Sequence, residues 1–174
     1  MTVGAVSSTN GITTNDDNIT IDCSNAPGGT IAVNQAITTA GSSSGGTVSV
    51  TGGVTIANTV TAAGGNVTLS GSAGQQTQIS STVSSDDGEI AFHSPILLTG
   101  DTIINADAGK ITLNGTIDGN FNLTLNTTGV TDINQAIGGS TALASLTTNA
   151  GGTTEVGANI TTPARLTLMR RHGR

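Results

Sequence analysis

A glycine followed by apolar residues two, four and eight positions later recurs along this chain. This repeat limits the possible folds more than any other feature. The unit is clearest in residues 87–126, where it occurs as Gly88 with Ile90, Phe92 and Ile96, and as Gly109 with Ile111, Leu113 and Ile117. The same register runs through glycines spaced 17 to 23 residues apart, namely Gly29, Gly46, Gly65, Gly88, Gly109, Gly129 and Gly152. The chain is therefore expected to consist of copies of one structural unit.

The positions within the unit indicate short strands joined by corners. Residues at plus two and plus four share one face of a strand, because side chains alternate along it. The glycine before them is expected to supply the unusual backbone angles of a tight corner, and a polar residue at plus five fits a second corner. The plus-four residues are all apolar, and those at plus eight begin another inward-facing strand: Ile37, Val54, Ala73, Ile96, Ile117, Ile137 and Ile160.

Such a unit cannot bury its apolar face alone, whereas stacking on copies of itself does so. The sequence therefore predicts an all-β fold, a parallel β-helix (solenoid) of about seven coils, each of about 20 residues. We assign residues 18–168 to the solenoid. Residues 1–17 are assigned to a poorly ordered N-terminal edge, and residues 169–174 to a basic tail and a non-native end.

Longer polar stretches in two coils are expected to leave the walls as excursions, at residues 71–86 and 138–152. In the second, Leu143 and Leu146 are expected to contribute to a third wall. Residues 123–126 (LTLN) and 166–169 (LTLM) have the alternation of third-wall strands as well.

An antiparallel β-sandwich is the structural alternative. Four Asx-Gly pairs mark turns, and such pairs favour two-residue hairpins. They are Asn10-Gly11, Asp87-Gly88, Asn114-Gly115 and Asp118-Gly119. The sandwich explains the alternation, but it does not explain why plus eight repeats together with plus two and plus four.

Composition excludes several functional classes. The chain has 174 residues, two Phe and no Tyr or Trp, so its core must be thin and aliphatic. Lys110 is the only basic residue before Arg165, and the net charge is -6, which argues against a nucleic-acid partner. Cys23 is the single cysteine, so neither an intrachain disulfide nor a thiolate metal cluster can form. No apolar run is long enough to insert in a membrane.

The segment GKITLNGTIDGNFNLTLNTTGVTDINQAIGGSTALASLTTNAGG, together with VNQAI at 33–37 and INQAI at 133–137, resembles a known repeat region. It is similar to bacterial adhesins of the filamentous-haemagglutinin and autotransporter-passenger type. The resemblance covers about residues 18–168. It implies a right-handed coil and export to the cell exterior or the outer-membrane surface of a Gram-negative-type bacterium. The export signal is then expected outside this chain.

Few residues offer chemistry. Asp132 and Glu155 both occupy plus three in adjacent coils, so their carboxylates are expected about one strand spacing apart and form a weak candidate Ca²⁺ site. Glu89 and Lys110 both occupy plus one, which predicts a cross-strand ion pair. No residue pattern points to a cofactor. His93, before Ser94-Pro95, is expected to be structural.

The alternative function is a carbohydrate-active enzyme fragment on a β-helix, acting through surface carboxylates. The available acids are Asp86, Asp87, Glu89, Asp101 and Asp107. With a single Lys in the body, binding of an acidic sugar is not favoured, and no catalytic constellation is visible. We expect instead a structural stalk or adhesive repeat segment of a larger exported protein, with no enzymatic activity.

The expected partner is a host or neighbouring-cell surface, including its glycans. Open strand edges at the ends of a solenoid also favour end-to-end self-association of the isolated chain.

Overall fold

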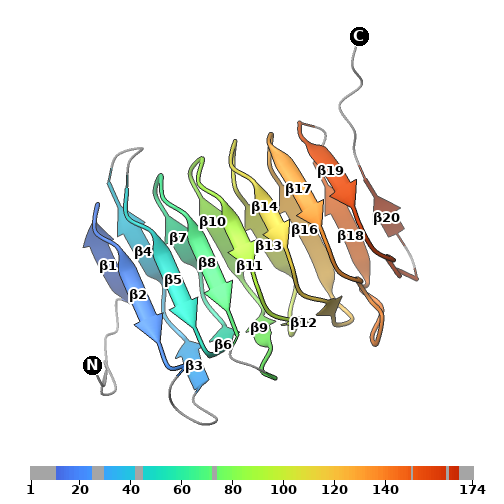
Figure 1. Ribbon diagram of the computed structural model, residues 1–174, viewed down its shortest axis with the longest axis horizontal. Helices are drawn as coiled ribbons and strands as arrows, with labels where there is room; N and C mark the ends of the chain where they lie inside the picture. The colour runs from blue at the N-terminus through green and yellow to red at the C-terminus, as the bar shows by residue number, and fades with distance from the viewer. Residues whose placement is uncertain are drawn as a thin grey trace.

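The computed structural model describes residues 11–24, 30–41, 45–71, 74–149, 151–163 and 165–168. These residues form 20 short strands stacked as a parallel β-solenoid of about six turns. Figure 1 shows the strands following one another along the long axis, from β1 near one end to β20 at the other. The described residues contain no helix that is long and apolar enough to cross a membrane.

Three parallel sheets form the walls of the solenoid, and the chain visits them in the order A, B, C. Wall A contains β1 (Ile12–Asn15), β4 (Ile37–Ala40), β7 (Val60–Ala62), β10 (Thr82–Ser85), β13 (Thr102–Asn105), β16 (Asn122–Asn126), β18 (Ser145–Thr148) and β20 (Arg165–Thr167). Wall B contains β2 (Ile19–Asp22), β5 (Val48–Thr51), β8 (Val67–Ser70), β11 (Ile90–Phe92), β14 (Ile111–Leu113), β17 (Val130–Ile133) and β19 (Thr153–Val156). Wall C contains β3 (Thr30–Val33), β6 (Gly53–Ile56), β9 (Thr77–Ile79), β12 (Ile96–Leu98) and β15 (Ile117–Asp118). Isolated parallel bridges at Ile137 and Ile160 continue wall C beyond β15.

This architecture confirms the predicted parallel β-solenoid. The antiparallel sandwich is wrong, because the strands within each described sheet pair in parallel, for example β11 with β14 and β12 with β15. The structure has about six turns, against about seven predicted. The right hand of the coil stays a prediction.

One aliphatic core fills the space between the walls. Its side chains stack in columns, and the column of Val48, Val67, Ile90 and Ile111 is entirely buried. Phe92 is the largest fully buried side chain. Burying each such aliphatic side chain contributes about 1.5–3 kcal/mol. Because a short strand contacts few residues of its own turn, this burial depends on the turns above and below.

Six of the repeating glycines, from Gly46 to Gly152, stand in one column at the corner between walls A and B, and Gly29 lies outside the described residues. A Cβ atom on Gly65 would lie 2.4 Å from the carbonyl oxygen of Gly46, and one on Gly88 would lie 2.2 Å from that of Gly65. None of these glycines is among the residues with a positive φ. The predicted reason for the glycines, unusual backbone angles, is therefore wrong. They are needed because the preceding turn leaves no room for a side chain.

Buried hydroxyls satisfy the backbone at this corner. The Oγ1 of Thr39 donates to the carbonyl of Gly46 at 2.7 Å, and the Oγ of Ser85 donates to that of Gly65 at 2.6 Å. The Oγ1 of Thr127 donates in the same way to the carbonyl of Gly109. The hydroxyls also accept backbone N–H groups, as Ser85 does from Gly88 at 3.0 Å. The buried hydroxyls of Thr39, Ser85 and Thr127 thus have partners, which avoids a penalty of about 1–3 kcal/mol for each.

The predicted register is wrong in the first unit. Residues 30–33 after Gly29 belong to wall C, where Ile31 pairs with Val54, and not to wall B. The wall B strand of that turn is β2, in which Ile19 pairs with Val48. The error has a physical reason: the alternation of apolar and polar residues is the same in all three walls, so it cannot assign a strand to one of them.

The predicted excursions contain wall strands. In residues 71–86, only 71–76 form the connection, and β9 and β10 follow, so Thr77 takes the wall C place expected for Ala73. In residues 138–152, Leu146 lies in β18 as predicted for a third wall, and Leu143 is fully buried before it. Strand β16 confirms the third-wall prediction at 123–126, and β20, which covers 165–167, confirms it for residues 166 and 167 of 166–169; residue 169 lies outside the described residues.

The N-terminal boundary also differs. Residues 12–15 were assigned to a poorly ordered edge, but they form β1, which pairs in register with β4. The alternation of apolar and polar residues in this segment is short, and its partner lies 25 residues ahead, as in the pair Ile12 and Ile37, so the sequence alone gives a weak signal. Residues 1–10 and the predicted basic tail, 169–174, lie outside the described residues.

Candidate functional site

Acidic side chains at the corners bind the backbone of the next turn. The carboxylate of Asp87 accepts the N–H of Ala108 at 3.0 Å, and that of Asp101 accepts the N–H of Asn122, also at 3.0 Å. Asp118 is a third case, because one oxygen accepts two backbone N–H groups, from Ser140 at 2.8 Å and Thr141 at 2.9 Å. All three carboxylates therefore join adjacent turns, including Asp87 and Asp101, which the sequence offered for chemistry.

Hydrogen bonds favour the ionised form of two carboxylates, the corner residue Asp101 and Asp22 at the end of β2. Donation from the backbone N–H and the side chain of Asn122 lowers the pKa of Asp101. Donation from the side chain and backbone of Ser24 likewise lowers the pKa of Asp22. A hydrogen bond to a carboxylate favours its charged form, which explains both directions.

A charged row crosses the outer face of wall B. Lys110 donates to Asp132 at 2.9 Å, and Glu89 accepts the hydroxyl of Thr112 at 2.6 Å. Both contacts are diagonal: they connect plus one of one turn with plus three of the next. The predicted ion pair between Glu89 and Lys110 is therefore replaced by the pair of Lys110 with Asp132. The long Lys side chain reaches across the strand spacing to the neighbouring column.

The ion pair shifts the pKa of both partners. The hydrogen bond from Lys110 lowers the pKa of Asp132, and the hydrogen bond to Asp132 raises the pKa of Lys110. Glu89 and Glu155 add smaller Coulombic contributions that also raise the pKa of Lys110. The Lys110 side chain is 44% exposed, so solvent screening keeps the contribution of the pair to stability small.

The two residues of the candidate Ca²⁺ site are neighbours. Asp132 pairs with Glu155 in the register of β17 and β19, as predicted. The Nζ of Lys110 already contacts Asp132, so a cation would have to displace an ammonium group. Among the described residues, no group of three or more His, Cys, Asp or Glu side chains is placed to hold a metal ion.

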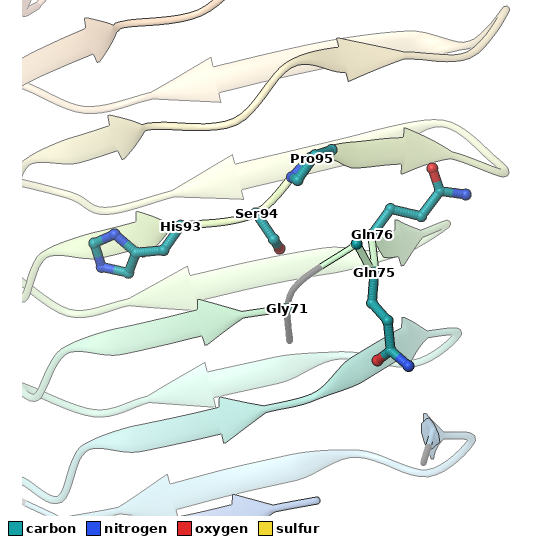
Figure 2. A pocket seen from close by; sticks show the side chains of 7 residues that line it. Gly71, Gln75, Gln76, His93, Ser94 and Pro95 are labelled. Atoms are coloured by element: carbon teal, nitrogen blue, oxygen red, sulfur yellow. The ribbon is translucent and has the colours of Figure 1, made fainter. Parts of the chain in front are cut away.

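A cleft of about 340 Å³ opens at the corner between walls B and C. It lies between the 71–76 connection and the next turn, and it is lined by Gly71, Gly74, Gln75, Gln76, His93, Ser94 and Pro95. Figure 2 shows Ser94 directed toward Gly71, with Gln76 extending on the side of Pro95. No lining side chain other than the imidazole of His93 is ionisable, so the cleft suits a neutral polar group.

Gly71 and Ser94 bring the two turns together at this cleft. A Cβ atom on Gly71 would lie 2.7 Å from the Cβ of Ser94, so no larger residue fits there. The Oγ of Ser94 is bonded to the Oγ1 of Thr77 at 2.9 Å, and both residues are buried. The rim of the cleft is therefore fixed from within the core.

Gln75 and His93 are the distinctive polar groups of the cleft. The Oε1 of Gln75 is buried without a hydrogen-bond partner among the described residues. The Nδ1 of His93 lies 3.2 Å from the Nδ2 of Asn114, whose Oδ1 accepts from Asn134 at 2.9 Å. Because Asn114 accepts through Oδ1, its Nδ2 group is the donor to His93. Nδ1 of His93 is then the acceptor, which assigns the imidazole proton to Nε2. The hydrogen bonds that join His93, Asn114 and Asn134 in three successive turns agree with the structural role expected for His93.

Sequence reasoning placed an excursion here but did not predict a cleft. The signal that could have located it is the polar stretch between the wall B strand ending at Ser70 and Thr77, which is longer than the matching connection in the next turn.

Comparison with protein-family models, with curated proteins and with solved structures finds no match for this chain. The likeness to bacterial adhesin repeats therefore rests on the sequence motifs alone.

Proposed function

We propose that this chain is a structural stalk or adhesive repeat segment of a larger exported bacterial surface protein, without enzymatic activity. One observation carries the proposal: strand pairing joins neighbouring turns without interruption in all three walls of the described solenoid. Such a rod grows in length with each added turn while its cross-section stays constant. These are the properties that a spacer between a cell surface and its surroundings requires.

The mechanical side of the proposal follows from the direction of the hydrogen bonds. The bonds between turns run along the rod axis, as in those from Ile90 N to Lys110 O and from Val67 N to Glu89 O, both 2.9 Å. Pulling the rod along its axis therefore loads all three walls together. The continuous aliphatic core adds burial that must also be lost before two turns separate.

The adhesive side rests on the cleft at the 71–76 connection. It combines amide, imidazole and hydroxyl groups with the apolar ring of Pro95, without a formal charge when His93 is neutral. Neutral sugars present hydroxyl groups that both donate and accept, so a glycan of a host or neighbouring cell suits this chemistry. We assign the glycan-contacting role to Gln76 and His93, which are exposed.

Force spectroscopy on the chain, held at its two ends, tests the stalk. The expected result is stepwise unfolding, in which one turn or a few turns peel away at a time. Small-angle scattering in the same buffer should give an elongated particle. A single low-force unfolding step, or a spherical scattering profile, would contradict the proposed stalk.

A glycan array and labelled cells test the adhesive surface. The matched pair of variants is Gln76→Ala, which removes an exposed side chain of the cleft, and Gln78→Ala, which removes a half-buried one on β9 outside it. Binding should fall at least about tenfold in the first variant, since 1.4 kcal/mol is tenfold in affinity. It should be unchanged in the second. Equal loss in both, or none in either, places the adhesive surface elsewhere.

The enzymatic alternative is checked with the same reagents. Glycans that bind are incubated with the chain, and the reducing ends released are measured. Hydrolysis that is lost in a carboxylate variant such as Glu89→Gln would overturn the assignment to a non-catalytic segment.

A further inference from the structure

Three polar side chains form a row along one edge of wall B, which we call the amide row. His93, Asn114 and Asn134 each follow the last residue of a wall B strand, in three successive turns. The backbone N–H of each residue donates to a carbonyl of the turn before it, at 2.9 to 3.0 Å, so the row is held in register. The side-chain bonds run the same way. Asn134 donates to Asn114 at 2.9 Å, and Asn114 donates to the Nδ1 of His93 at 3.2 Å.

The amide row begins at the ion pair on the outer face of wall B. The side chain of Asn134 also donates to the carboxylate of Asp132, which lies two residues earlier in β17. The pKa of Asp132 is lowered by the hydrogen bond from Lys110 and, to a smaller extent, by the one from Asn134. Asp132 is therefore ionised at neutral pH, and an ionised carboxylate accepts hydrogen bonds but has none to donate. Its role at the start of the row cannot be reversed.

This carboxylate decides the direction of the whole row. An amide side chain has a donor end and an acceptor end, which exchange places when the group rotates by half a turn. Rotation of Asn114 alone would place its Nδ2 opposite the Nδ2 of Asn134. Rotation of both amides would turn the Oδ1 of Asn134 toward the carboxylate of Asp132. Each alternative sets like groups against each other, so the row has one satisfied direction.

The direction of the row determines what His93 offers to a ligand. A neutral imidazole carries one N–H group and one bare nitrogen, and Nδ1 is the acceptor of the bond from Asn114. The proton then lies on Nε2, which has no hydrogen-bond partner in the described part of the chain. His93 is exposed and lines the cleft. Figure 2 shows it at one end of the cleft, with Ser94 between it and Pro95.

We propose that Asp132 fixes the tautomer of His93, two turns away, and thereby makes His93 a hydrogen-bond donor to the occupant of the cleft. Asp132 is a positioning residue, because it is not among the residues that line the cleft and acts through Asn134 and Asn114. The ligand that fits presents an acceptor oxygen to His93, such as a hydroxyl or carbonyl oxygen of a sugar. This consequence for binding rests on the proposed adhesive function, whereas the coupling between Asp132 and His93 does not.

Nitrogen-15 NMR of the imidazole tests the coupling without any ligand. The chain has two histidines, so a His172→Asn background leaves His93 as the single imidazole. Spectra recorded at about pH 9, above the ordinary titration range of imidazole, report the ratio of the Nδ1–H tautomer to the Nε2–H tautomer. In this background the Nε2–H tautomer should dominate.

Asp132→Asn is the decisive variant. An amide of the same shape donates as well as accepts, so the reversed row is then satisfied too. The ratio of Nδ1–H to Nε2–H should rise about tenfold, which is the effect of roughly one hydrogen bond. Glu155→Gln is the matched control. It makes the same change at the register neighbour of Asp132, which has no bond to the row among the described residues, and it should leave the ratio unchanged.

Two further variants act on the row itself. Asn114→Asp places an acceptor opposite Nδ1, so the Nδ1–H tautomer should dominate and show that the readout responds. Asn134→Ala cuts the row but leaves Asp132 in place, and it should raise the ratio as Asp132→Asn does. Circular dichroism verifies that each variant is folded; should Asp132→Asn unfold, Asn134→Ala carries the test.

The outcomes separate the coupling from the adhesive function. A dominant Nδ1–H tautomer in the His172→Asn background, an unchanged ratio when the row is cut, or an equal rise in Glu155→Gln overturns the coupling. On the glycan array, Asp132→Asn should bind more weakly than Glu155→Gln, and equal binding overturns the donor role of His93. A tautomer that responds as expected in a chain that binds no glycan contradicts the adhesive function and supports the coupling.

Discussion

The carbonyl oxygen of Gly88 lies 2.0 Å from the position that a Cβ atom on Gly109 would occupy. Neither glycine has a positive φ. The glycine at this corner is therefore demanded by the turn next to it and not by its own backbone conformation. The same relationship links Gly46 with Gly65 and Gly129 with Gly152, so the repeat in the sequence records contacts between turns.

Replacing Gly109 by Ala should destabilise the chain, because the new methyl group must displace the backbone of the preceding turn. Overpacking of this kind costs about 1–3 kcal/mol. Gly139→Ala is the matched control, since the nearest atom to its Cβ is 3.8 Å away. The control should leave stability unchanged or raise it by about 0.4–1 kcal/mol through the unfolded state. Denaturant midpoints of the two variants measure the difference, and equal midpoints would contradict the steric explanation.

Replacing Ile111 by Asp should disrupt its own turn and its neighbours. Ile111 is 0% exposed, and an unpaired charge in this thin core should cost more than about 3 kcal/mol. Ile103→Asp makes the same chemical change in the preceding strand of the same turn, at a side chain that is 43% exposed. That variant should stay within about 0.5 kcal/mol of wild type. Thermal unfolding followed by circular dichroism compares them, and the inward assignment of Ile111 fails if both variants melt alike.

Replacing Lys110 by Met should reveal the repulsion among Glu89, Asp132 and Glu155. At about pH 7 the variant should be slightly less stable than wild type, with a lower melting temperature. In wild type the pKa of Asp132 is lowered from its ordinary value of 3.8, so its contribution is present above that value and is lost as the pH falls below it. The difference in melting temperature between the two chains should therefore shrink on acidification. Lys110→Arg keeps the charge and should follow wild type; an unchanged difference at about pH 3 would rule out this account.

Replacing Gln75 by Met should raise stability by about 1 kcal/mol, because the buried Oε1 has no partner among the described residues and an apolar group of similar shape removes its desolvation penalty. Gln76→Met changes an exposed neighbour and should have little effect. Denaturant midpoints are compared for both. A loss of stability in the first variant alone would show that the amide oxygen is bonded in solution.

The site was less predictable than the fold. The register placed Asp132 beside Glu155 correctly, because cross-strand neighbours follow from position within the unit. The predicted ion-pair partner of Lys110 was wrong. The choice between Glu89 and Asp132 depends on how far the flexible Lys side chain reaches from the plus-one column to the plus-three column. The cleft was not foreseen, since it forms only where the 71–76 connection meets His93 and Pro95 of the next turn.

The sequence by itself determined the parallel stacking of turns and the inward columns of wall B from Val48 onward, because both follow from local alternation repeated at a nearly constant spacing. Only the tertiary structure decided which wall each strand joins, as at residues 30–33, and why glycine recurs at the corner. The physical reason is that the two-residue alternation separates inward from outward side chains in the same way in every strand, so it does not distinguish one wall from another. The identity of the wall, the space at a corner and the reach of a side chain depend on the neighbouring turn.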